Sequence, residues 1–161
     1  MDEETLADMC PDAEIQQPGG LKRRTPSETL LVVDDDPWVL RVTVDFLAGE
    51  EGYHVLQTTG AEEALGIAET YDGPIHLLLT DVVMPKVNGW MLAKRWRLIR
   101  PETKVLFMTA FSSELVSDYR TSLGDPVIMK PCDLADLGHK VRELLGYSSP
   151  FARRRPAKRW P

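Results

Sequence analysis

The chain has 161 residues, of which 43% are hydrophobic, and a formal net charge of −6. This length allows one domain with a modest surplus at its ends, and no apolar run approaches the roughly 20 residues of a membrane span. The first residues, MDEETLADM, lack the basic and apolar regions of a signal peptide. Cys10 and Cys132 have neither disulfide nor metal-ligand spacing. We therefore expect a cytoplasmic protein without a membrane segment or a disulfide framework.

The charge is unevenly distributed along the chain. Residues 1–28 hold seven acids and three bases, residues 29–146 hold eighteen acids and eleven bases, and residues 147–161 hold five bases and no acid. An acidic body argues against nucleic acid as the main partner of the folded part. The basic end leaves open a contact with nucleic acid, lipid or an acidic partner, although it is too short for a folded DNA-binding domain.

In chain order, residues 1–28 contain prolines, glycines and acids without periodicity, which predicts a disordered extension. From Thr29 onward, strand-like runs alternate with helical stretches. The runs are LLVV, YHVLQT, IHLLLT, KVLFM and PVIM, and the helical stretches lie near 37–50, 60–71, 88–100, 112–123 and 133–146. This alternation predicts βαβ units around a parallel sheet. We expect an α/β domain of three layers over 29–146 and a flexible basic tail over 147–161.

Polar residues stand at or just past the C-terminal ends of the predicted strands. They are Asp34, Asp35, Asp81, Thr109 and Lys130. In an open α/β sheet, ligands bind in the crevice beyond the carboxyl ends of the strands. Mg²⁺ prefers oxygen ligands such as carboxylates. An ammonium and a hydroxyl can donate hydrogen bonds to phosphoryl oxygens. The pattern therefore predicts a site for phosphoryl chemistry.

Singly, most of these residues have simpler explanations. Asp34, Asp35 and Asp36 also fit a solvated turn with a helix N-cap, although three acids in series repel one another and a Mg²⁺ ion would relieve this. Threonine is common in strands, which is enough to explain Thr109. Lys130 can be explained as a lysine at the sheet edge whose ammonium reaches the solvent. The joint pattern in this order is what favours a site.

Asp81 is the sharper signal because it ends the most hydrophobic strand, and the next helix starts several residues later, near Asn88. A carboxylate there can accept a phosphoryl group covalently. Trp38, just after the acidic cluster, is interpreted as a packing residue on a helix face.

The runs LLVVDDDP, LLLTDVVMPKVNGW, VLFMTA and IMKPCD resemble the receiver domains of bacterial two-component response regulators, over about residues 29–146. The resemblance implies a flavodoxin-like (βα)5 fold with parallel strand order 2-1-3-4-5. It implies that Asp81 is the phosphoacceptor. It also implies that Mg²⁺ is bound by Asp34, Asp35, Asp81 and the backbone carbonyl of Val83.

The same resemblance implies that Thr109 and Lys130 contact the phosphoryl oxygens and that the Lys130–Pro131 peptide bond is cis. The donor would be a sensor histidine kinase or a histidine phosphotransfer protein. The output partner would bind the face built from residues 112–146, with no membrane contact. Such a domain is a signalling module that catalyses only its own phosphotransfer and slow dephosphorylation, and not an enzyme acting on other substrates.

The sequence departs from the family pattern at two places. Val127 occupies the switch position, where the family commonly has Tyr or Phe, so a coupled aromatic rotation is excluded and the signal must use another element. Val83 and Phe111, two residues past Asp81 and Thr109, are both apolar. We hypothesise that this pair slows loss of the phosphoryl group, because polar side chains there can orient the attacking water.

Two other functions use similar ingredients. A Mg²⁺-dependent aspartyl-phosphate phosphatase of the haloacid dehalogenase type has its nucleophile in a DxD motif after the first strand, whereas the isolated Asp81 follows the third. A flavodoxin-like FMN binder needs a phosphate-binding loop after the first strand, where this chain carries Asp34, Asp35 and Asp36. These acids would repel the phosphate.

Overall fold

The computed structural model describes residues 27–110 and 124–147. Several sequence predictions lie outside these residues, and the structure does not test them. They are the extension up to residue 26, the helix at 112–123, the position of Phe111 and the basic tail from residue 148 onward.

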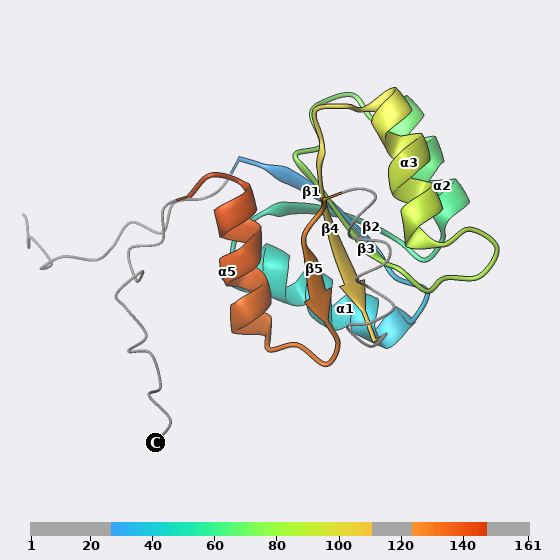
Figure 1. The fold of residues 1–161 in the computed structure, drawn as a ribbon. Helices are drawn as coiled ribbons and strands as arrows, with labels where there is room; N and C mark the ends of the chain where they lie inside the picture. Colours follow the sequence, from blue (N-terminus) through green and yellow to red (C-terminus); the bar gives the residue numbers. More distant parts are fainter. Residues whose placement is uncertain (1–26, 111–123, 148–161) are drawn as a thin grey trace, which may run out of the picture.

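The core of the molecule is a five-stranded parallel sheet with the order β2-β1-β3-β4-β5 (Figure 1). Its strands are β1 (Thr29–Val33), β2 (His54–Thr58), β3 (Leu77–Asp81), β4 (Lys104–Thr109) and β5 (Val127–Met129). All pairs between neighbours are parallel. The predicted fold class and strand order are confirmed.

Helices cover both faces of the sheet, and three of them begin at polar caps. The helices are α1 (Pro37–Asp45), continued by the π-helical turn η1 (Phe46–Glu50), α2 (Ala61–Thr70), α3 (Gly89–Ile99) and α5 (Leu134–Leu144). Asp36, Asn88 and Asp133 each accept hydrogen bonds from backbone N–H groups in the first turn of α1, α3 and α5. Each cap satisfies donors that would otherwise lack a partner, which explains why the helices start there.

The sequence predicted one helix over 37–50, and the structure divides it. The last turn widens so that the Glu51 N–H bonds to the carbonyl of Phe46 at 3.2 Å, five residues back. The apolar spacing of one turn does not distinguish this π-turn from an α-helix. The apolar periodicity of the sequence therefore could not predict the π-helical turn at Phe46–Glu50.

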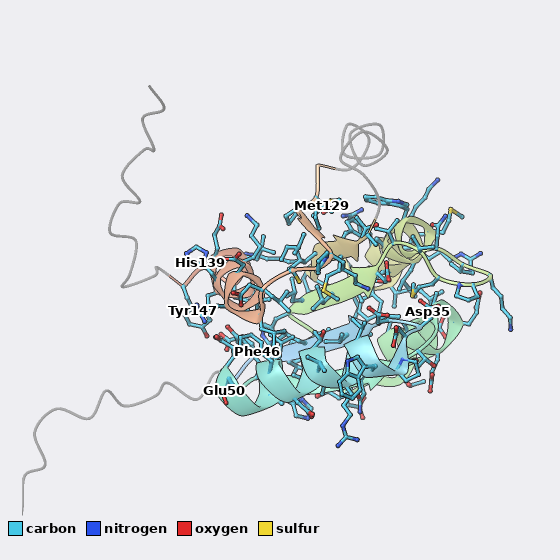
Figure 2. All side chains as sticks on the ribbon, turned by 90° about the horizontal axis from the view of Figure 1, so that it is seen from below. Asp35, Phe46, Glu50, Met129, His139 and Tyr147 are labelled. Carbon is cyan, nitrogen blue, oxygen red and sulfur yellow. The ribbon has the colours of Figure 1, made fainter. Side chains whose placement is uncertain are left out.

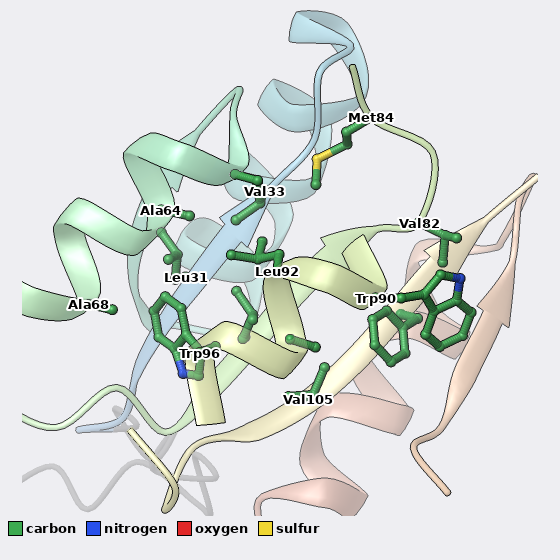
Figure 3. Packing of buried hydrophobic residues seen from close by; sticks show 14 of the residues in the cluster. Leu31, Val33, Ala64, Ala68, Val82, Met84, Trp90, Leu92, Trp96 and Val105 are labelled. Atoms are coloured by element: carbon green, nitrogen blue, oxygen red, sulfur yellow. The ribbon is translucent and has the colours of Figure 1, made fainter. Parts of the chain in front are cut away.

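Alternate residues of β1 enter two separate cores. Leu31 and Val33 belong to the core under α2 and α3, and Leu30 and Val32 belong to the core under α1 and α5. Figure 3 shows the first core, in which fully buried Trp96 of α3 packs near Leu31 and the alanines of α2. Because β1 is covered on both faces, its run is continuously apolar.

The two ends of the described domain meet. Tyr147, just after α5, donates a hydrogen bond through its hydroxyl to Glu28, just before β1. Figure 2 shows Tyr147 at the end of the molecule opposite to Asp35. In the described part of the chain, no helix has the length and apolar character needed to cross a membrane.

Candidate functional site

The polar residues singled out in the sequence lie together at the carboxyl ends of the parallel strands. Asp34 and Asp35 directly follow β1, Asp81 ends β3, Thr109 ends β4, and Lys130 directly follows β5. These strands are neighbours in the sheet, and their parallel pairing places the ends side by side. The fold therefore assembles the site from four separate segments.

Lys130 forms the centre of the site. Its Nζ donates to Oδ2 of Asp34 at 2.6 Å and to Oδ2 of Asp81 at 2.7 Å. The other oxygen of each acid accepts from a backbone N–H, that of Asp36 for Asp34 and that of Val83 for Asp81, both at 3.0 Å. The two carboxylates are thus held at both oxygens, which fixes their orientation before any ligand binds.

Burial and hydrogen bonds shift the pKa values of two charged groups in the site. Burial raises the pKa of the Asp34 carboxyl above its ordinary value, and the hydrogen bonds from Lys130 and the Asp36 backbone oppose this only in part. Burial acts to lower the pKa of Lys130, but the hydrogen bonds to Asp34 and Asp81 outweigh it and the pKa is raised. The ammonium therefore stays charged at neutral pH.

Three carboxylates in the described residues are close enough to share a cation. One oxygen each from Asp34, Asp35 and Asp81 lies within 4.8 Å of the others. Asp34 is fully buried, whereas Asp35 is exposed, so the group opens to solvent on one side. This donor set, hard oxygen ligands of like charge, fits the preference of Mg²⁺. Asp36 does not belong to it, because its carboxylate caps α1.

The other predicted site residues lie around this centre. Thr109 is fully buried, and its backbone carbonyl accepts from the Lys130 N–H at 2.7 Å. Val83 is 48% exposed beside Asp81. The Lys130–Pro131 peptide bond is cis. Val127 lies on β5, where it packs against the core under α2 and α3.

Sequence reasoning missed Gly89, the first residue of α3. A Cβ atom on Gly89 would lie 2.1 Å from the backbone oxygen of Asp81, and the Gly89 N–H donates to the carbonyl of Val82 at 2.9 Å. Only glycine allows the helix start to approach the acceptor loop this closely. Its one signal in the sequence is its place beside Asn88, where the helix was expected to start, and this position does not indicate a contact with Asp81.

The interpretation of Trp38 as a packing residue is wrong. Its side chain is 74% exposed, because α1 turns its first-turn residue outward while Leu40 and Thr43 enter the interior. Helical spacing alone could not place residue 38, since it stands at the edge of the apolar stripe.

A family model described as the response regulator receiver domain matches residues 30–142. The chain belongs to this family. Among curated proteins, the receiver is 32% identical over 117 residues to the response regulator receiver protein CpdR of Brucella abortus, covering 72% of this chain and 95% of CpdR. It is 28% identical to the response regulator SaeR of Staphylococcus aureus and spans 50% of that protein's length.

Solved structures agree with this assignment. A CheY-like receiver domain protein from Methanospirillum hungatei is 31% identical, with a TM-score of 0.67 over 74% of this chain and 94% of that one. The receiver domain of the hybrid histidine kinase CckA is 32% identical, with a TM-score of 0.61 over 73% of this chain and 98% of that one. The receiver is therefore a signalling module of two-component systems. The phosphatase and FMN-binding alternatives find no support in these matches.

Proposed function

We propose that Asp81 of this receiver accepts one phosphoryl group from a histidine kinase or a histidine phosphotransfer protein. The receiver would then act in the cytoplasm as a phosphorylation-controlled interaction module of a phosphorelay. The observation that carries the proposal is the position of Lys130 Nζ, 2.6 Å from Asp34 and 2.7 Å from Asp81. It supports the proposal because a fixed cation beside Asp81 would stabilise the negative charge of a phosphoryl group bound there.

In the transfer step, one carboxylate oxygen of Asp81 attacks the phosphorus atom. The P–N bond of the donor phosphohistidine breaks, its electron pair stays on the imidazole nitrogen, and that nitrogen takes a proton from solvent. The product is an acyl phosphate on Asp81. The Lys130 ammonium exchanges its contact with Oδ2 of Asp81 for a phosphoryl oxygen and keeps its contact with Asp34, and the Thr109 hydroxyl contacts a second phosphoryl oxygen. Little covalent work is left for other side chains.

Asp34, Asp35 and Asp81 would hold Mg²⁺, together with the backbone carbonyl of Val83. Bound there, the ion supplies charge neutralisation for the phosphoryl oxygens. Support comes from the spacing of the three carboxylates, within 4.8 Å of one another. Lys130 alone supplies one positive charge against three negative ones, so a divalent cation would bring the site close to neutrality.

The signal would leave through the surface that includes β5 and α5, within residues 112–146. Val127 packs in the core and is not aromatic, so the coupling uses backbone and loop movement rather than rotation of an aromatic ring. In this proposal residues 29–146 form the receiver unit, flanked by the extension 1–28 and the tail 147–161.

The test is to incubate the protein with phosphoramidate or acetyl phosphate and Mg²⁺ and to measure its intact mass. We expect a gain of one phosphoryl group that is lost in Asp81→Asn. Asp36→Asn is the matched control, because asparagine caps a helix as well as aspartate does and Asp36 lies outside the three-carboxylate group. An unlabelled native protein, or equal labelling of Asp81→Asn, would refute the assignment.

A further inference from the structure

An apolar groove lies directly beside the site. It has a volume of about 380 Å³ and runs between α1 and the segment that leads from β5 into α5. Trp38, Val39 and Val42 form one wall, and Pro131, Cys132 and Leu134 form the other. Trp38 is 74% exposed at its rim, which is unusual for a residue of this size. The groove therefore offers an uncovered aromatic surface.

Exposed acids adjoin both walls of this groove in the sequence. Asp35 and Asp36 precede Trp38 in the chain, Asp133 directly follows Cys132, and all three are exposed. Lys130 is the one basic residue among the described residues that line the groove, and it is bound to Asp34 and Asp81. The groove is thus apolar along its walls and flanked on both walls by neighbouring acids, which suits a segment with basic and aromatic side chains.

Residues 148–161 of this chain have that composition. The sequence SSPFARRRPAKRWP carries five basic residues, no acid, and two aromatic residues, Phe151 and Trp160. In a chain whose net charge is −6, this is the segment whose charge best complements the acids of the groove.

The length of the segment also fits. Leu134 lines the groove at the first turn of α5, and the segment follows Tyr147 beyond the last turn. The return along α5, over residues 134–147, covers about 20 Å at the rise of an α-helix. Extended chain reaches about 26 Å over the eight residues to Arg155 and about 43 Å over the thirteen to Trp160. The arginines at 153–155 can therefore reach Asp133, and Trp160 can reach Trp38.

We propose that residues 148–161 bind back into this groove, with the arginines at 153–155 against Asp133 and Trp160 against Trp38. With Trp160 against Trp38, the neighbouring Lys158 and Arg159 bring positive charge toward Asp35, and this charge competes with Mg²⁺ and with the phosphodonor. This binding is an autoinhibitory contact of the receiver. The binding stands on the groove and the charges alone, whereas its effect on phosphorylation rests on the proposed function.

The binding is tested by nuclear magnetic resonance on the full chain. Its amide spectrum is compared with that of the full-length variant carrying Arg153→Glu, Arg154→Glu and Arg155→Glu. We expect shift differences at the Trp38 indole and at Val42 and Leu134, and we expect high salt to shift the native signals in the same direction. Differences confined to residues 148–161, or differences on α3, would overturn the proposal. Differences that depend on protein concentration would also overturn it, because they indicate binding between two copies.

The groove side is tested with a matched pair of variants. Trp38→Ala and Leu98→Ala both remove a large exposed side chain, since Leu98 is 85% exposed, but Leu98 lies on α3, across the sheet from the groove. We expect Trp38→Ala to shift the signals of residues 153–160 and Leu98→Ala to leave them unchanged. Equal shifts, or no shift in Trp38→Ala, would contradict the assigned groove.

The regulatory consequence is tested by the rate of labelling with phosphoramidate. We expect the variant reversed at 153–155 to be labelled roughly three to ten times faster than the native chain at low salt, the range expected when several exposed ion pairs are lost. Equal rates would refute autoinhibition. If neither protein is labelled, the proposed function fails, and the spectra still decide whether the segment binds the groove.

Discussion

Replacing Lys130 by methionine removes the one cation between two largely buried carboxylates. Side-chain exposure is 17% for Lys130, 0% for Asp34 and 12% for Asp81. Removing one partner of a buried ion pair costs about 3 to 5 kcal/mol. Because Lys130 and Asp81 keep some contact with water, we expect a loss of about 2 to 3 kcal/mol in the free energy of unfolding at pH 7.

The loss depends on pH in a direction set by Asp34. Burial already raises the pKa of Asp34 in the native protein, and without Lys130 it rises further, since that residue supplies the main opposing hydrogen bond. A carboxyl group whose pKa is higher in the folded than in the unfolded state destabilises the fold above the folded pKa and not below the unfolded one. The penalty of Lys130→Met is therefore largest at neutral pH and shrinks as the pH falls toward the ordinary value of aspartate.

Urea denaturation of Lys130→Met and the native chain at pH 7 and pH 5, with and without Mg²⁺, measures these effects. We expect the difference between the two proteins to fall at pH 5 and to fall at pH 7 when Mg²⁺ is added. Lys140→Met is the matched control, because Lys140 pairs with Glu143 on the surface of α5 and its loss should cost under about 0.5 kcal/mol. A penalty that is the same at both pH values and insensitive to Mg²⁺ would refute the electrostatic reasoning.

Three further outcomes follow from the geometry. Gly89→Ala should lower the free energy of unfolding by more than about 2 kcal/mol in thermal denaturation, because its Cβ would clash with the Asp81 carbonyl. The control Gly66→Ala, whose Cβ would have no atom within 4 Å, should raise the free energy of unfolding by about 0.5 to 1 kcal/mol. Equal effects of the two substitutions would contradict the close approach of Gly89 to Asp81. Asp35→Asn should weaken Mg²⁺ binding about tenfold in a fluorescence titration, since one of three carboxylates loses its charge, and an unchanged affinity would exclude Asp35 as a ligand. Burial raises the pKa of the Cys132 thiol, so its alkylation at pH 8 should be slower than that of a free cysteine peptide; an equal rate would contradict the burial.

The strand order and the shared position of the site residues could be predicted because both follow from chain order in a parallel sheet. Asp34, Asp81 and Lys130 each stand after an apolar run, and parallel strands end at one edge. The contact of one ammonium with both acids could not be predicted, because it depends on side-chain directions that strand positions do not specify. The three-layer arrangement could be predicted from the alternation of strand-like runs and helical stretches alone.

The close approach of Gly89 and the exposure of Trp38 were out of reach for a different reason. Each depends on how a helix is rotated and shifted against the sheet. Periodicity gives the apolar stripe of a helix but not the neighbours at its ends. For Gly89 the deciding quantity is the distance of 2.1 Å from an added Cβ atom to the backbone oxygen of Asp81, at the end of the preceding strand. The sequence pattern of the loop does not specify this distance.

The contact between Tyr147 and Glu28 has a consequence for how the receiver can be rebuilt. Because the residue before β1 and the residue after α5 touch, at the end of the molecule away from Asp35, a short linker can join them and new termini can be opened in an exposed loop. Such a circular permutant changes the order in which the strands are made, and we expect the contacts of Lys130 with Asp34 and Asp81 to stay in place. The receiver is, in this sense, a closed unit that can be inserted into a loop of another protein.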